Sequence, residues 1–399
     1  MKNPSGDRQS CDAFKSRTYF NALDGLRAVS ILMVLFHHVT KYPAQHWLQT
    51  LQENGRYGVA FFFVISGFLI CTLFLREEEG NGRIDLWKFY GRRALRLLPL
   101  YYAALLLQAV TVFALHLYTP ENEQIFREKL PAYLFYYSNW LATATQGPFF
   151  QSWSLAVEEQ FYLAFGLLLF FVRRRLVVGA VLAAWCVKFF VFTVFGTVDA
   201  DSTLWRIVFS YQEPVLFGVL IAFAMNCRRY YEVFARWLGG RWVSAVIGVM
   251  LAAWLFWHPM QTQSSWDAQV LYLLMTLVLI CEVVRPAAPL LGGRLPVHVG
   301  KISYGIYLLH MFVICTVKKI PGMTSPAVCF FFSSMAVIVL ASLVYKYFEH
   351  PIIVFYKRKL SPVRAKAAPP PAAATNERLK SSAKPAKIMP DADAPAEAG

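Results

Sequence analysis

An apolar stretch near the N-terminus carries residues that can bind anions or move protons: Asp24, Arg27, His37 and His38. At about 100° and about 1.5 Å per residue, Arg27 and His38 are separated by about three helical turns and share one face with Asp24. His37 points about 80° away from that face. If this helix spans a bilayer, Arg27 lies near one interface and His38 near the middle of a hydrocarbon layer about 30 Å thick. The pattern indicates either a polar face turned toward a protein interior or water-filled path, or an arginine anchor with a hydrogen-bonded structural histidine.

Two arginines, Arg93 and Arg96, enter another apolar segment just before Pro99. Residues three apart are neighbours on a helix face, and two adjacent guanidinium groups suit bidentate binding of phosphate. The other interpretation is a pair of positive anchors at the membrane surface. The position of Arg96 inside the predicted helix favours an anion-binding function.

Three further apolar segments contain polar residues. Glu158 and the carboxylate beside it enter one segment, and at least one of them should point inward, because lipid solvates charge poorly. Ser303, Tyr307 and His310 follow the i, i+4, i+7 spacing of one helix stripe, and Glu349 ends the last apolar segment. These residues have structural interpretations as well: a hydrogen bond or salt bridge for Glu158, a satisfied buried imidazole for His310, and pairing with a loop arginine for Glu349.

The composition is that of a membrane protein. Of the 399 residues, 57% are hydrophobic, 16% aromatic and only 16% charged, which is too apolar for a soluble domain of this length. The seven cysteines are dispersed, with no CxxC pair and no histidine at metal-ligand spacing, so we expect neither a disulfide framework nor a metal site. The net charge of +15 lies in loops, which indicates membrane orientation rather than nucleic-acid binding. No cleavable signal peptide is expected, because the first apolar run contains Arg27 and lacks a small-residue cleavage site.

We expect an all-α integral membrane protein with about ten transmembrane helices and a disordered cytoplasmic C-terminal tail. The apolar segments of spanning length lie near 24–42, 57–75, 95–117, 155–172, 176–197, 204–225, 243–258, 267–284, 302–318 and 326–347. A shorter apolar piece, 131–147, is broken by proline and polar residues and follows a polar loop from Thr119 to Lys129. We expect this piece to be interfacial or re-entrant.

The distribution of basic residues predicts the orientation. With ten spans and an inner N-terminus, the arginine-rich loops at 76–93, 173–175 and 228–241 all fall on the inner side. An eleventh span at 131–147 would move the later basic loops outside, so we expect both termini in the cytoplasm. The expected organisation is a cytoplasmic segment 1–19, a membrane domain 20–358 and an Ala/Pro/Lys-rich tail 359–399.

Six motifs, in this order, resemble those of acyltransferase family 3, the membrane proteins that include the O-antigen and exopolysaccharide O-acetylases. They are Leu23 to Arg27 followed by His38, Gly58 to Ile70, Arg93 and Arg96 before Pro99, Trp153 to Tyr162, Ser303 and Tyr304 with His310, and Tyr347 to Glu349 with Pro351. The resemblance covers nearly all of the predicted membrane domain.

The resemblance implies an enzyme that moves an acyl group, commonly acetyl, from cytoplasmic acyl-CoA to a hydroxyl of a surface or secreted glycan or of a lipid-linked sugar. It also implies a multi-pass protein of the bacterial inner membrane, with acyl-CoA as a substrate and no permanently bound cofactor. The residues regarded as essential in the family map to Arg27, His38, Arg93 and Arg96. Two departures stand out: Ala60 occupies a position where many members have aspartate, and the tail stands where some relatives carry a periplasmic hydrolase-like domain.

On this interpretation, Arg93 and Arg96 bind the CoA phosphates, and His38 takes a proton from the acceptor hydroxyl as it attacks the thioester carbonyl. Arg27 lies about 16 Å from His38 along the helix, so we expect it to hold the donor or to pair with Asp24. The residues expected to bind substrate or to support the site are Asp24, Glu158, Tyr307, His310 and Glu349.

Two alternatives follow from the same residues. An acyl-histidine relay would let donor and acceptor bind from opposite sides of the membrane. A transporter or flippase for a glycan or an anionic solute would also place charged residues among about ten helices.

Overall fold

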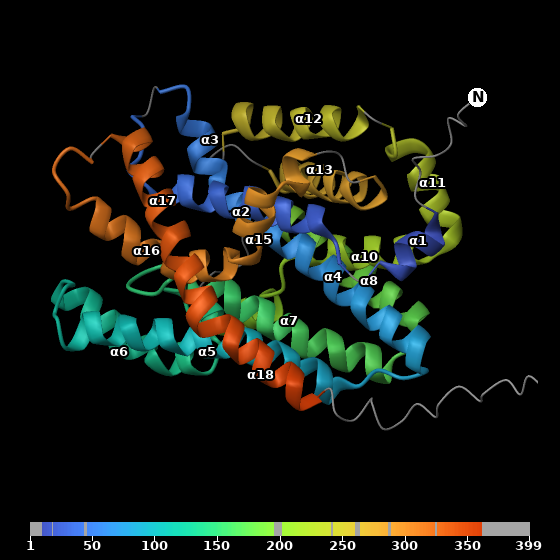
Figure 1. The fold of residues 1–399 in the computed structure, drawn as a ribbon, viewed down its shortest axis with the longest axis horizontal. Coiled ribbons are helices and arrows are strands. Elements are labelled where there is room, and N and C mark those ends of the chain that lie inside the picture. Colours follow the sequence, from blue (N-terminus) through green and yellow to red (C-terminus); the bar gives the residue numbers. More distant parts are fainter. Residues whose placement is uncertain are drawn as a thin grey trace, which may run out of the picture. The chain divides into compact units, whose positions relative to one another are not determined.

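The computed structural model describes residues 10–17, 19–43, 46–194, 202–240, 242–259, 264–285, 289–323 and 325–360. Every regular element in these ranges is a helix, which confirms the all-α prediction (Figure 1). The first compact unit ends at Ile353, and a second unit begins at Val354, within α18 (His350–Leu360). The predicted disordered tail, 359–399, lies almost entirely beyond the described residues.

Seven helical runs in the described residues are long and apolar enough to cross a membrane. They are α3 (Gln49–Asn54) with η1 (Gly55–Tyr57) and α4 (Gly58–Asn81); α5 (Leu86–Phe113); α7 (Ser152–Phe171); α8 (Arg174–Val194); α9 (Thr203–Val208) with α10 (Glu213–Asn226); α13 (Ser265–Val284); and α17 (Pro326–Val344), which continues through η4 (Tyr345–Glu349) into α18. Two bent pairs add up to two more spans: α11 (Arg228–Leu238) with α12 (Val243–Trp257), bent by 80°, and α15 (Arg294–Lys301) with α16 (Ser303–Val317), bent by 75°.

The predicted count of ten spans is therefore not confirmed, since the described residues provide seven to nine. The difference lies in α2 (Asn21–His38), whose charged and imidazole side chains lower its mean hydropathy. This helix is also shorter than the predicted 24–42, and His38 is its last residue rather than an interior one. The buried Gln52 amide caps this end of the helix, where it donates to the carbonyl oxygens of Phe36 (3.0 Å) and Thr40 (2.9 Å).

The segment before α7 contains a helix that the polar sequence of 119–129 did not predict. In α6 (Pro120–Leu134), the Thr119 side chain caps the N-terminus by accepting from the Asn122 backbone N–H, and Pro120 occupies the first turn. The remainder of 131–147 is irregular apart from one short turn, η2 (Ser138–Trp140). This segment is not among the candidate spans, in agreement with the prediction that it does not cross the membrane.

Contacts between loops define one end of the bundle. α1 (Cys11–Ser16) packs on α11, and Lys15 pairs with Glu79 at the end of α4 (3.2 Å). Arg174, at the start of α8, pairs with Glu78 (2.7 Å). The N-terminal segment and three of the basic loops are thus neighbours.

The opposite end gathers a different set of loops. Lys318 donates to the carbonyl oxygen of His38 (3.2 Å), and the His38 ring centre lies 5.6 Å from that of Phe150. Asn54 donates to the carbonyl oxygen of Leu255 (2.8 Å). This end therefore contains the connections that follow α2, α12 and α16 and the connection that precedes α7. The charges of the loops predict the same arrangement, in which successive connections lie at alternate ends of the bundle.

The crossing of α4 and α10 depends on two glycines. A Cβ atom on Gly67 would lie 2.2 Å from the carbonyl oxygen of Val215, and one on Gly218 would lie 2.2 Å from that of Val64. Small residues let helix backbones approach closely within a membrane. Because α4 also packs on α2 and α7, this crossing helps to fix the helices that surround the candidate site.

We predict that Gly218→Ala destabilises the protein by about 1–3 kcal/mol, because the added methyl group must force α4 and α10 apart. Thermal unfolding in detergent measures the effect. Gly179→Ala is the matched control, since no atom lies within 4 Å of the added Cβ in α8. Equal unfolding temperatures for the two variants would contradict the close crossing.

Candidate active site

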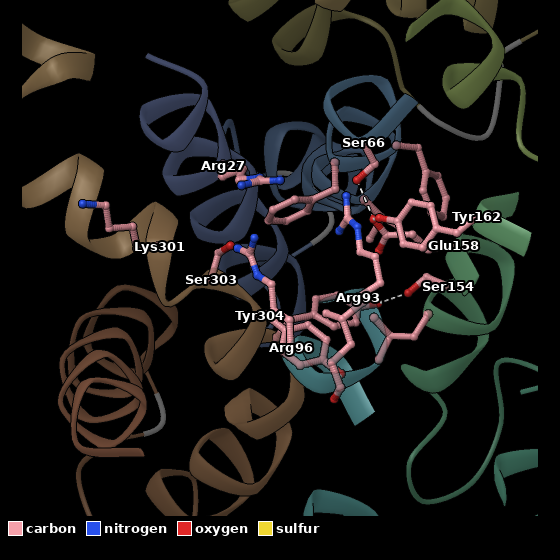
Figure 2. A pocket seen from close by; sticks show the side chains of 16 residues that line it. Arg27, Ser66, Arg93, Arg96, Ser154, Glu158, Tyr162, Lys301, Ser303 and Tyr304 are labelled. Atoms are coloured by element: carbon pink, nitrogen blue, oxygen red, sulfur yellow. Dashed lines mark hydrogen bonds between the residues drawn. The ribbon is translucent and has the colours of Figure 1, made fainter. Parts of the chain in front are cut away.

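A pocket with about 670 Å³ of empty space, part of which is open solvent, lies among α2, α4, α5, α7 and the corner between α15 and α16 (Figure 2). Its apolar lining comes mainly from α4 and includes Val59, Phe62 and Phe63. Its polar lining comes from all five elements and comprises Arg27, Ser66, Arg93, Arg96, Ser154, Glu158, Tyr162, Lys301, Ser303, Tyr304 and Tyr307. The fold therefore brings together polar residues that are far apart in the sequence.

Three guanidinium groups converge on this space. Figure 2 shows Arg27, Arg93 and Arg96 directed toward the same region, with Lys301 farther out at the rim. The Arg93 guanidinium lies 4.5 Å from the centre of the Tyr162 ring, a favourable cation–π contact. Among the described residues, Arg96 has no acidic partner within ion-pair distance. The excess of positive charge suits a ligand that carries more than one negative charge.

Asp24 holds Arg27 at the edge of the pocket. Its carboxylate lies 3.3 Å from an Arg27 terminal nitrogen, and its other oxygen accepts a hydrogen bond from the Tyr19 hydroxyl. Burial and this hydrogen bond raise the pKa of Tyr19, so the hydroxyl stays protonated as a donor. A Cβ on Gly300 would lie 1.9 Å from the Asp24 carbonyl oxygen. That close approach of α15 to α2 brings Lys301 to the same pocket.

Glu158 is the carboxylate in the pocket wall, and two hydroxyl groups fix its position. The side chains of Ser66 and Tyr162 both donate to Glu158 Oε1. Since the Tyr162 ring also faces Arg93, these contacts orient the arginine as well. Glu158 therefore supports the cationic side of the pocket without forming an ion pair with Arg93 or Arg96.

Tyr307 connects the pocket with two histidines. Its hydroxyl lines the pocket and lies 2.6 Å from that of Ser154, and its backbone carbonyl lies 2.6 Å from His310 Nδ1. The ring centres of His310 and His38 are 5.0 Å apart. The polar lining thus continues from the pocket toward the C-terminal end of α2.

Both histidines keep one ring nitrogen available. Nδ1 of His38 lies 2.9 Å from the carbonyl oxygen of Val34, and Nδ1 of His310 bonds to that of Tyr307. Because a carbonyl oxygen only accepts, Nδ1 carries the proton in each neutral ring and Nε2 has a lone pair. His310 is completely buried, and its Nε2 has no hydrogen-bond partner among the described residues.

The two adjacent histidines of α2 face different surroundings. His37 Nδ1 lies 3.1 Å from the carbonyl oxygen of Gln52, whereas His38 packs against His310 and Phe150. This difference agrees with the angular separation predicted from the helical period. Only His38 contacts the polar residues that lead to the pocket.

The structure joins most of the predicted site residues, although not in one cavity. The pocket contains Arg27, Arg93, Arg96, Glu158 and Tyr307, with Asp24 paired behind Arg27. His38 and His310 form a neighbouring pair outside the pocket lining. Glu349 is not part of the pocket lining, but it lies close enough to Arg96 to interact with the charge of that side chain. It is buried near Gly305, and its Oε1 atom has no hydrogen-bond partner among the described residues. Among the described residues Glu349 forms no ion pair with a loop arginine, so that alternative is not confirmed.

Several pocket residues were not predicted. Ser66 lies in the motif 58–70, and Lys301 lies two residues before Ser303, so their position in or beside the quoted motifs was a usable signal. Tyr162 follows Glu158 by one helical turn, which places both on one face. Ala60, by contrast, is buried outside the pocket lining.

The described residues contain no group of three or more histidine, cysteine or acidic side chains placed to hold a metal ion.

Comparison with known proteins gives matches over most of the chain. "Putative O-acetyltransferase SACOL0978" of Staphylococcus aureus (strain COL) is 29% identical over 367 residues, which cover 85% of this chain and 58% of that protein. "O-acetyltransferase OatA" of Staphylococcus aureus (strain NCTC 8325 / PS 47) is 26% identical over 371 residues, which cover 87% and 59%. This chain thus spans less than two thirds of the length of these curated relatives. No solved structure gives a significant match.

The family model described as "Acyltransferase domain" (Acyl_transf_3) matches residues 20–347. This match includes every helix that lines the pocket and both histidines. The chain belongs to acyltransferase family 3.

Proposed function

We propose that this protein is a membrane O-acyltransferase that moves an acyl group, in the simplest case acetyl, from acyl-CoA to a hydroxyl of a glycan or lipid-linked sugar. The observation that carries the proposal is the arginine pocket joined through Tyr307 to the His38–His310 pair. The relatives are named O-acetyltransferases, which supports an oxygen acceptor and an acetyl group.

The proposed donor is an acyl-CoA, whose phosphates would bind at Arg93 and Arg96. Guanidinium groups suit phosphate because they offer parallel N–H donors, and Arg96 forms no direct ion pair with a carboxylate among the described residues. The uncharged pantetheine arm would pass Val59 and Phe62, which supply the apolar wall. The thioester end would then reach the histidines near Tyr307.

His38 is the proposed general base. Its Nε2 lone pair would take the proton of the acceptor hydroxyl while that oxygen attacks the thioester carbonyl carbon. Collapse of the tetrahedral intermediate breaks the C–S bond, and the CoA thiolate takes the proton back from His38. Positive charge therefore develops on the His38 ring, and the buried lone pair of His310 beside it would stabilise that charge. His310 is in this account a positioning residue.

We infer that the protein lies in the bacterial inner membrane with both termini and the α4–α5 connection in the cytoplasm, and that the connection between α5 and α7 lies outside. The basic loops gathered at the α1 end of the bundle support this orientation. Single cysteines at exposed positions in 82–88 or 121–128, in a background without native cysteines, test it. An impermeant thiol reagent should label only the second group in intact cells, and labelling of only the first group would reverse the orientation.

We predict that Arg93→Ala and Arg96→Ala each weaken acyl-CoA binding in detergent by about one to two decades, through loss of a charge-assisted contact of about 1.5–3 kcal/mol. Arg92→Ala is the matched control, because Arg92 is half exposed and pairs with Glu77 outside the pocket. If Arg92→Ala weakens binding as much as the pocket variants do, general surface charge rather than the pocket binds the donor.

We predict that His38→Gln lowers acyl transfer by about 10²–10⁴-fold, the usual contribution of a general base, without loss of expression or of acyl-CoA binding. The measurement is incorporation of labelled acetyl from acetyl-CoA into glycan by isolated membranes. His37→Gln, which alters a side chain bound to the Gln52 carbonyl, should retain most of the activity.

His310→Phe extends this test, because it keeps a ring but removes the lone pair. It should lower kcat by about tenfold, equivalent to about 1.4 kcal/mol, with an unchanged KM for acyl-CoA. An active His38→Gln protein together with an inactive His37→Gln protein would refute His38 as the base.

A further inference from the structure

The short helix α11 lies away from the pocket and has three distinct faces. Its inner face packs on α1, α10 and α13, where Tyr231 and Ala235 are buried. Its other two faces are exposed and differ in chemistry. A helix at a protein–water surface needs one apolar face, which packs on the protein. The second apolar face of α11 therefore calls for another explanation.

One exposed face is apolar. Tyr230, Val233 and Trp237 are 55%, 48% and 73% exposed, and their i, i+3, i+7 spacing places them on one line along the helix. The stripe adjoins the buried face but does not contribute to it. An aromatic residue at each end of such a stripe is typical of the membrane–water interface.

The remaining face is basic. Arg228 pairs with Glu232 (2.8 Å), but Arg229 and Arg236 are exposed and have no acidic partner among the described residues. These two arginines are seven residues apart and therefore lie on nearly the same line. That line runs beside the apolar stripe, so two unpaired guanidinium groups border Val233.

The direction of α11 fits a helix that lies in the membrane surface. It makes an angle of 80° with α12, and Figure 1 shows it across the end of that helix. Where α12 crosses the bilayer, α11 is then nearly parallel to the membrane plane. In that position the apolar stripe meets the boundary of the acyl chains and the arginines reach the headgroups.

We propose that α11 is an interfacial helix that binds anionic phospholipids through Arg229 and Arg236 while Tyr230, Val233 and Trp237 enter the bilayer boundary. The occupant is lipid because the stripe is only one side chain wide, whereas the adjacent unpaired cations match a negatively charged headgroup. This inference depends on neither the acyl donor nor the acceptor.

The first test compares thermal unfolding in detergent after addition of phosphatidylglycerol or phosphatidylcholine. Phosphatidylglycerol should raise Tm by several degrees more than phosphatidylcholine, and Arg229→Gln/Arg236→Gln should abolish that difference. Arg173→Gln/Arg175→Gln removes the same charge from exposed positions at the start of α8, and this variant should retain the difference between the two lipids. The proposal fails if both double variants behave alike or if the two lipids have equal effects.

The second test measures depth in the bilayer. In a background with Cys186, Cys227 and Cys315 replaced by serine, a fluorescent label is attached at Trp237→Cys or, as a control on the basic face, at Glu232→Cys. Brominated phosphatidylglycerol in nanodiscs should quench the label at 237 and leave that at 232 nearly unchanged. Equal quenching would show α11 to be immersed as part of a span, and absence of quenching at 237 would show that the stripe faces water or protein. Either result overturns the proposal.

Discussion

The site depends on placing three arginines around one space inside an apolar helical bundle. Guanidinium groups in such a setting are costly unless carboxylates, aromatic rings, water or an anionic ligand stabilise them. Here the neutralisation within the protein is partial. Asp24 pairs with Arg27, the Tyr162 ring faces Arg93, and Arg96 forms no direct ion pair among the described residues. The remaining positive charge is the physical reason to expect an anionic substrate in this pocket.

The helix α2 then sets the distance over which the chemistry must act. Arg27 lies in its second turn and His38 at its end, about 16 Å apart along the axis at about 1.5 Å per residue. A compact anion held by the arginines could not reach His38, whereas an extended molecule with phosphates at one end and a thioester at the other could. Contacts of α2 with α4, α13, α15, α16 and α17 hold this helix at the centre of the first compact unit. The close contact between Gly300 and the Asp24 backbone holds the N-terminal part of α2 against α15.

Helical periodicity was sufficient to predict the parts of the site that lie within single helices. It separated His38 from His37 and placed Arg93 beside Arg96, because both relations depend only on about 100° per residue. It could not predict that Ser66 would meet Glu158 or that Tyr307 would join the pocket to His310, since these contacts arise from packing between helices. The missed helix α6 and the predicted ten spans have a common cause. In α6 the polar composition conceals the capping signal of Thr119 and Pro120, and in α2 the length of the apolar run conceals the effect of its charged residues on mean hydropathy.

In the proposed mechanism, one extended donor connects the arginine pocket to the His38–His310 pair. The most direct measurement is a cryo-EM structure of the protein in a nanodisc with a non-reactive thioether analogue of acetyl-CoA. We expect phosphate density beside Arg93 and Arg96, and the acyl end of the analogue within hydrogen-bonding reach of His38 Nε2. Phosphate density elsewhere, or an analogue that occupies the pocket while its acyl end points away from His38, would refute a single extended donor.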